Sequence, residues 1–168
     1  MKSNRIERHR GKMPNKYGVV IFIMVLLLVS CTETGLVFSS YNHIPDRGWD
    51  KRNILRFTPE ITDTLATYDI SVLLRYNNDY AYNNLWLFVT YPQDTIMRTD
   101  TLDCRLADRF GKWYGSGWGA SYQQEVPLQS GVRFPGSGKQ TIMIQQGMRD
   151  DITSHITDVG IKIVRREK

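Results

Sequence analysis

The chain has 168 residues, of which 41% are hydrophobic and 23% charged, and its formal net charge is +5. Six of the 22 basic residues and one of the 17 acidic residues precede Cys31, which leaves 16 of each from Cys31 onward. This neutral remainder argues against nucleic acid or an anionic surface as the partner.

The N-terminal segment has the layout of a secretory signal. Basic residues precede an apolar run of eleven residues, Val19–Val29. As a helix such a run rises only about 16 Å, whereas the hydrocarbon core of a bilayer is about 30 Å thick. We therefore predict a signal peptide over residues 1–30. If translation began at Met13, the signal would still be complete, with Lys16 as its basic residue.

Cys31 follows the apolar run after a single serine, in the sequence Leu28-Val29-Ser30-Cys31. This order resembles the bacterial lipobox, in which the cysteine thiol receives a diacylglycerol group and the signal is cleaved before it. We expect Cys31 to become the lipid-modified (palmitate-bearing) N-terminus, with residues 31–37 as a tether; the alternative is ordinary secretion with a chance cysteine. Cys104 then has no disulfide partner, and we predict that it is a small buried strand residue.

Alternation of apolar and polar residues dominates the 138 residues that start at Cys31, a length that suits one domain. The alternation predicts strands over residues 68–76, 85–89, 95–106, 122–128, 139–145 and 159–164. The segment Asn77-Asn78-Asp79 is expected to end the first of these. Leu85–Val89 is apolar on both faces, as in a central strand, and Tyr91-Pro92 is expected to end it.

Helical periodicity is nearly absent, with room for a turn or so at 59–67 and at 148–156. Short strands separated by turn residues favour an all-β fold, a single β-sandwich of jelly-roll or immunoglobulin-like type over residues 38–168. The pattern leaves the strand order open.

The sequence predicts no metal, nucleotide, catalytic residue or other cofactor beyond the acyl group on Cys31. His43 and His155 have no ligand-type residue at metal spacing. Gly136-Ser137-Gly138-Lys139 resembles the end of a phosphate-binding loop. However, Arg133 occupies the position of that loop's first glycine, and a strand follows where a helix would be needed. We therefore predict a hairpin turn. Ser116 lacks the glycine of a nucleophile elbow, because Tyr114 occupies that position.

The segment Gly111–Gly119 interleaves four glycines with three aromatic residues, Trp113, Tyr114 and Trp118. We expect a mobile loop. Its aromatic side chains would contact a protein partner or stack on sugar rings, or Trp113 would fold back over the open end of the sandwich.

Several segments occur in an order that resembles the gliding-motility lipoprotein GldH family of the Bacteroidota. They are the lipobox at Cys31, Asn83–Val89, Gly111–Gly115, Gln146–Arg149 and Ile156–Ile161. The resemblance implies a lipid-anchored outer-membrane protein of the gliding and type IX secretion machinery, without enzymatic activity, that contacts other envelope proteins. The domain would face the periplasm or the cell surface.

Candidate contact residues are Trp113, Tyr114, Trp118 and Arg149; Arg149 would otherwise pair with a neighbouring aspartate. The alternative function is an envelope glycan-binding β-sandwich that uses Trp113, Tyr114 and Trp118 as a stacking platform.

Overall fold

The computed structural model describes residues 34–166, so the predicted signal peptide and Cys31 lie outside the described residues. The described part contains strands and no helix, which confirms the all-β prediction. The strands are β1 (Leu36–His43), β2 (Trp49–Asp50), β3 (Leu55–Phe57), β4 (Glu60–Ile61), β5 (Tyr68–Asn77), β6 (Asn84–Gln93), β7 (Ile96–Arg105), β8 (Ser116–Trp118), β9 (Ser121–Val132), β10 (Gly138–Lys139), β11 (Ile142–Gln146), β12 (Ile152–Thr153) and β13 (Ile156–Arg165). Within residues 34–166 no helix exists that could span a bilayer.

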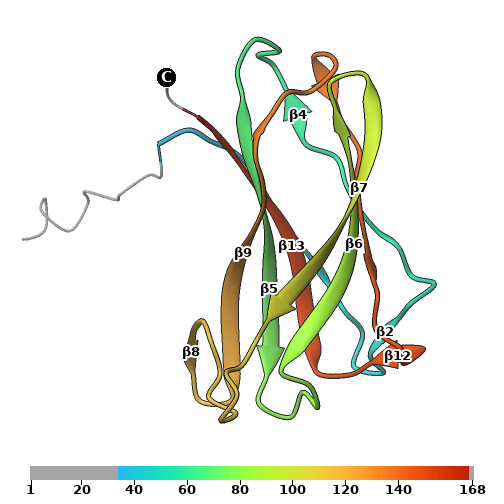
Figure 1. Cartoon of the computed structure of the whole chain (residues 1–168), viewed down its shortest axis with the longest axis vertical. Helices are drawn as coiled ribbons and strands as arrows, with labels where there is room; N and C mark the ends of the chain where they lie inside the picture. Colours follow the sequence, from blue (N-terminus) through green and yellow to red (C-terminus); the bar gives the residue numbers. More distant parts are fainter. Residues whose placement is uncertain (1–33, 167–168) are drawn as a thin grey trace, which may run out of the picture. The chain divides into compact units, whose positions relative to one another are not determined.

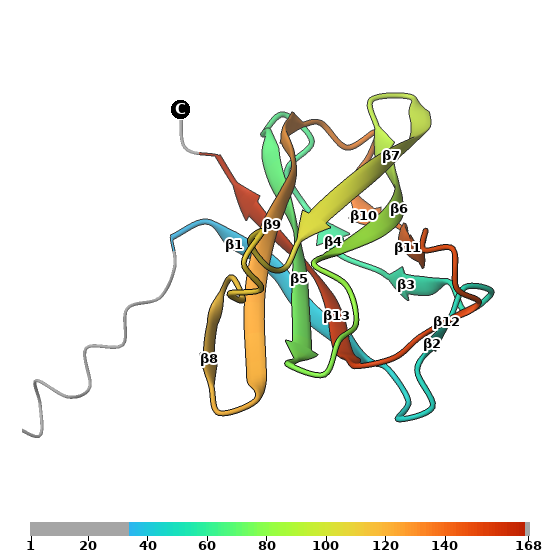
Figure 2. The same ribbon diagram turned by 60° about the horizontal axis from the view of Figure 1, so that its bottom comes forward.

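Two antiparallel sheets face each other and form the predicted β-sandwich (Figures 1 and 2). One sheet has the order β1-β13-β5-β9-β8, and the other has the order β3-β11-β6-β7. Two small two-stranded sheets, β10-β4 and β12-β2, lie beside them. The segments 59–67 and 148–156, where a helical turn had room, form short strands and loops instead.

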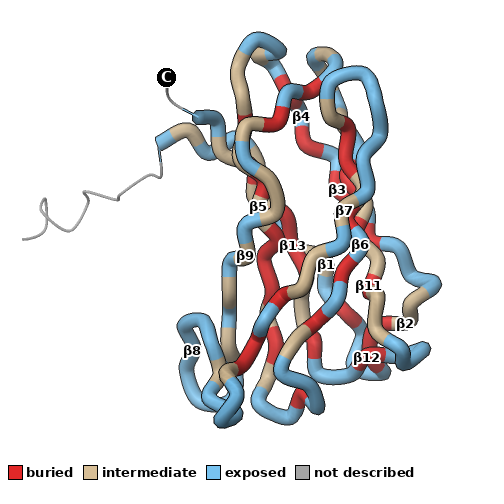
Figure 3. Tube along the Cα trace, in the orientation of Figure 1, coloured by how far each residue is buried: buried red, intermediate tan, exposed pale blue. Residues whose placement is uncertain are grey.

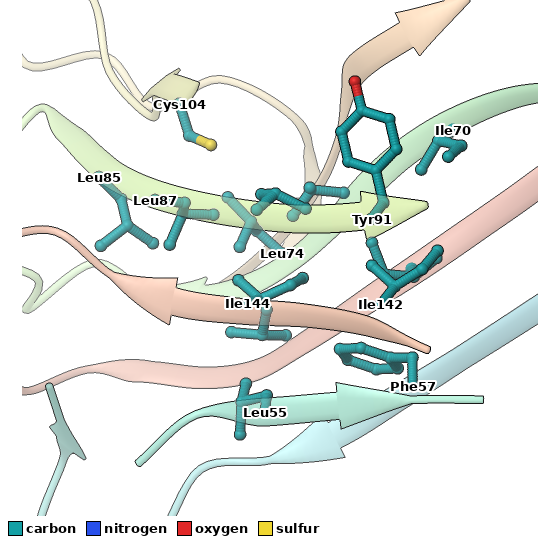
Figure 4. Packing of buried hydrophobic residues seen from close by; sticks show 14 of the residues in the cluster. Leu55, Phe57, Ile70, Leu74, Leu85, Leu87, Tyr91, Cys104, Ile142 and Ile144 are labelled. Atoms are coloured by element: carbon teal, nitrogen blue, oxygen red, sulfur yellow. The ribbon is translucent and has the colours of Figure 1, made fainter. Parts of the chain in front are cut away.

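The core consists of the inward faces of both sheets (Figure 3). Alternation along β5 buries Ile70, Val72 and Leu74, while Leu85 and Leu87 of β6 pack toward them from the opposite layer (Figure 4). Cys104 of β7 is fully buried and pairs with Leu85, which confirms its predicted role as a buried strand residue.

Strand ends differ from the prediction in two places. β6 continues through Pro92, which pairs with Met97 of β7. β11 accompanies β6 only as far as Thr90, so at Pro92 the strand has a neighbour on one side and its missing N–H costs no ladder bond. The predicted strand 139–145 is divided, because β10 pairs with β4 whereas β11 pairs with β3 and β6.

Three further expectations are corrected by strand pairing. β1 begins at Leu36, so two residues of the predicted tether, Leu36 and Val37, belong to a strand, and Leu36 pairs with Val164 of β13. Gly136–Lys139 is not a hairpin turn, because β10 does not pair with β9. The glycine-rich segment is not a free loop, since Ser116–Trp118 forms β8 against β9 and Trp113 bridges to Ala107.

The two ends of the sandwich carry different connections (Figure 1). The start of β1 lies at the same end as the β4–β5, β6–β7 and β9–β10 connections, which we call the proximal end. The backbone N–H of Asp94 donates to the carbonyl oxygen of Arg133 across this end (2.8 Å). The β5–β6 and β8–β9 connections and β12 lie at the opposite, distal end.

Candidate functional site

Two aromatic rings stand on the solvent-facing side of β6. Alternation sends Leu85, Leu87 and Val89 into the core, so Trp86 and Phe88 point outward, where they are 40% and 41% exposed. The apolar residues on both faces of this strand suggested a strand covered on both sides. A two-layer sandwich covers only one side of each sheet, so the second apolar face meets solvent.

These rings line a groove of about 710 Å³ between β6 and the segment after β11. Its lining consists of Tyr82, Asn84, Trp86, Phe88, Thr101, Gly147, Met148, Arg149 and Asp150. The backbone N–H of Gly147 donates to the carbonyl oxygen of Trp86 (2.7 Å), and the N–H of Trp86 donates to Sδ of Met148 (3.3 Å). The segment after β11, which forms the wall of the groove, is therefore hydrogen-bonded directly to β6, which forms its floor.

The segment after β11 is held by the buried side chain of Gln146. Its amide nitrogen donates to the carbonyl oxygen of Asp150 (3.0 Å), and its amide oxygen accepts from the N–H of Met148 (2.7 Å). A buried amide with both ends bonded defines the path of the backbone around it. Met148 and Arg149 thus lie in a turn that the hydrogen bonds of Gln146 hold in place.

The polar groups at the rim are bonded to one another. The hydroxyl of Tyr82 donates to Oδ2 of Asp150, and this hydrogen bond raises the pKa of Tyr82. The side-chain amide of Asn84 donates to Oδ1 of Asp103 (2.7 Å). The groove therefore combines an apolar floor with a rim whose hydrogen-bonding groups are partly occupied.

Arg149 is the exception at this rim. Its side chain is exposed, and among residues 34–166 it has no hydrogen-bond or ion-pair partner. The expectation that it pairs with a neighbouring aspartate is wrong, because Asp150 accepts from Tyr82 and Asp151 pairs with Lys51. A guanidinium without a partner beside an apolar groove is available to a carboxylate brought by a ligand.

The three predicted aromatic contact residues do not form one surface. The Trp113 ring packs on Tyr76 (centroids 5.6 Å apart) and Tyr122 (6.0 Å), as expected for a side chain folded back over the sandwich. Tyr114 is partly exposed in a different hollow, beside Arg105 and Arg109.

Trp118 is 94% exposed on β8. No ring contact within the described part of the chain joins it to Trp113 or Tyr114. Of the candidates, only Arg149 lines the groove on β6.

Sequence reasoning missed Trp86, Phe88, Met148 and Tyr82 as site residues. The signal was present, because a strand with apolar residues on both faces exposes one face in any two-layer fold. What the pattern lacks is the position of Met148, which reaches Trp86 only through the pairing of β11 with β6.

Neither His43 nor His155 belongs to a cluster that would hold a metal ion, within the part of the chain that the structure covers. His43 is within hydrogen-bonding distance of Asp158 (3.2 Å) on the surface of the β1–β13 pair. Burial raises the pKa of the Cys104 thiol to about 12, which makes a nucleophilic role unfavourable.

Comparison with known proteins identifies the family. A sequence model described as GldH lipoprotein matches residues 36–163, which include all but the last two residues of the strand framework. A gliding motility lipoprotein GldH homolog from Christiangramia forsetii is 32% identical over 164 residues, covering 92% of this chain and 99% of the relative. The gliding motility lipoprotein GldH of Flavobacterium johnsoniae is 28% identical over 160 residues, covering 90% of this chain and 98% of that protein. The chain therefore belongs to the GldH lipoprotein family.

Proposed function

We propose that this protein is a lipid-anchored outer-membrane accessory or assembly component of the gliding-motility and type IX secretion machinery. It acts by binding other envelope proteins and not by catalysis. Family membership supports the link to gliding motility and the lipoprotein character. Cys31, which carries the lipobox pattern, is the residue to which we assign the anchor.

The groove on β6 is the observation that carries the proposal of a protein contact. Trp86 and Phe88 offer large apolar side chains to solvent, and Met148 adds a side chain that adapts its shape. Exposed aromatic residues next to an arginine are typical of the centre of a protein interface. The unpaired guanidinium of Arg149 indicates a partner segment that places a carboxylate beside an apolar side chain.

The carboxylates of β7 support a role without catalysis, because their hydrogen bonds are structural. Asp100 accepts from the hydroxyl of Tyr91 (2.6 Å) and from Nε of Arg98 (2.8 Å). Asp103 accepts from Asn84. The bonds from Tyr91 and Asn84 join β6 to β7, and the bond from Arg98 lies within β7.

Site-specific photo-crosslinking in living cells tests the contact. A photoreactive phenylalanine analogue at position 88 should form an adduct with an envelope protein, and Arg149→Gln should reduce that adduct. The analogue at Phe110, which is exposed outside the groove, is the matched control. Equal adducts at positions 88 and 110, unaffected by the Arg149 change, would exclude the groove as the contact.

Deletion of the gene tests the larger assignment. Loss of surface motility, or of proteins from the culture medium, is the expected result. Unchanged motility together with an unchanged set of secreted proteins would rule out a role in this machinery.

The glycan-binding alternative is less well supported, because Trp113 packs inward and is lost from the stacking platform. It retains one favourable observation, the almost fully exposed ring of Trp118 beside Arg75 and Tyr122. Saturable binding on a glycan array that disappears in Trp118→Ala would favour it.

A further inference from the structure

Exposed aliphatic side chains gather at the proximal end of the sandwich, away from the groove on β6. Leu65 in the β4–β5 connection is 88% exposed, and Ile96 and Met97 at the start of β7 are 65% and 54% exposed. Single exposed apolar residues are common on soluble proteins, but these three lie in or next to two connections, β4–β5 and β6–β7, at the same end of the sandwich (Figure 1).

These side chains are held outward by hydrogen-bonded turns. Oδ1 of Asp63 accepts from the backbone N–H groups of Leu65 (2.9 Å) and Ala66 (3.2 Å). The hydroxyl of Tyr68 donates to the carbonyl oxygen of Asp63 (2.6 Å), which fixes the turn to β5. The turn before Ile96 is tied to the β9–β10 connection by the bond from the N–H of Asp94 to the carbonyl oxygen of Arg133. Their exposure is therefore a property of the fold.

Charge at this end is nearly balanced. Arg165 pairs with Asp63 (2.8 Å) and Arg166 lies 3.6 Å from Asp69, whereas Arg133 has no side-chain partner among residues 34–166. A hollow of about 750 Å³ lies between Leu65, the three arginines and Gly35. Of the three arginines that line this hollow, Arg133 is the one without an ion-pair partner among residues 34–166, and Leu65 lies beside it as an exposed apolar side chain.

The short chain between Cys31 and β1 determines which end of the sandwich can contact the bilayer. Cys31 precedes Gly35 by four residues, which span at most about 14 Å when extended. The eight residues of β1 lead from Leu36 toward the distal end, a further distance of about 26 Å. A lipid on Cys31 therefore holds the bilayer within reach of the proximal end and brings Leu65 and Ile96 toward it.

We propose that the proximal end is a bilayer-docking surface, in which Leu65, Ile96 and Met97 enter the interface of the membrane and Arg133 contacts a lipid phosphate. This inference rests on the lipid attachment at Cys31 that the proposed function assigns. Docking of this kind is driven mainly by burial of apolar side chains. It directs the groove on β6, which starts near the distal end, away from the membrane.

Depth-dependent fluorescence quenching tests the proposal. The mature lipidated protein, which starts at Cys31, is reconstituted into vesicles of phosphatidylethanolamine and phosphatidylglycerol that contain a spin-labelled lipid. An environment-sensitive fluorophore is attached in Leu65→Cys or, as the matched control at the distal end, in Trp118→Cys; burial protects Cys104 from the label. The label at position 65 should be quenched about twofold or more beyond the label at position 118, and this difference should persist in concentrated salt.

Each contrary outcome has a distinct meaning. Equal quenching at both positions, in a chain that floats with the vesicles, overturns the docking surface and leaves the proposed function intact. Quenching that disappears in concentrated salt overturns apolar insertion. A chain that does not float overturns the lipid anchor of the proposed function, and the docking surface with it. If the fluorescence of the label at position 65 depends on protein concentration and not on the presence of lipid, a second copy of the chain covers this end. That result also overturns the proposal.

Discussion

Gly147 passes so close to the ring of Phe88 that a Cβ at position 147 would lie 3.0 Å from Cε2 of that ring. This contact sets the width of the groove, because the wall and the floor meet where only a glycine leaves room for the aromatic ring. The backbone of Gly147 is not in the left-handed region, so the requirement for glycine is a matter of space.

Gly147→Ala should displace the Phe88 ring and narrow the groove. Since the ring borders solvent and can move, we expect the free energy of unfolding to change by less than about 1 kcal/mol. The photo-crosslink from position 86 to its partner should fall sharply. Gly136→Ala is the matched control, because nothing lies within 4 Å of its added Cβ. Equal crosslinking in the two variants would contradict the importance of groove width.

Arg149→Gln should weaken partner capture without destabilising the fold, since an unpaired exposed side chain contributes about 0.5 kcal/mol or less to stability. Affinity is measured with the crosslinked partner once it is known, at low and high salt. The loss should be largest at low salt, because the interaction is between exposed charges. Arg133→Gln, which also removes an unpaired exposed arginine but at the proximal end, should leave this affinity unchanged.

Trp113→Ala and Trp118→Ala should differ in their effect on stability. Trp113 packs against Tyr76 and Tyr122, so its truncation should cost about 2–4 kcal/mol of unfolding free energy in urea titrations. Trp118 is almost fully exposed, so its loss should cost less than about 0.5 kcal/mol. Equal destabilisation would show that β8 contributes to the core.

Cys104 should resist alkylation in the folded protein. Burial raises its pKa to about 12, so at pH 8 only about one thiol in ten thousand is ionised, and burial also blocks access. Iodoacetamide should modify Cys104 at the ordinary rate only after unfolding, and the native rate should rise as pH approaches 12. Rapid labelling of the native protein at pH 8 would contradict the buried position.

Metabolic labelling with a palmitate analogue should mark the protein, and Cys31→Ala should abolish the label. Cys104→Ala controls for nonspecific thioester formation, since its thiol is buried and should carry no acyl group. A label that survives in Cys31→Ala would contradict the anchor assignment.

The local sequence pattern by itself predicts the anchor, the position of several strands and the burial of Cys104. The charge of the leader, the short apolar run and the position of Cys31 are properties of neighbouring residues, and they predict an anchor without any fold. Alternation placed β5 and β13 nearly where they occur, because a side-chain period of two is imposed by the strand itself. The burial of Cys104 followed from the same alternation.

Strand pairing between distant segments decided which side chains are exposed and which of them come together at the groove. The pattern shows that Leu85–Val89 has two apolar faces, but only the packing of one sheet on the other decides that Trp86 and Phe88 remain outside. Trp113 and Trp118 look alike in sequence, yet one contacts Tyr76 and the other meets solvent. Arg149 reaches the groove because β11 pairs with β6, a contact between segments more than fifty residues apart. Local alternation defines the faces of a strand, and the neighbours supplied by the tertiary structure decide which face is covered.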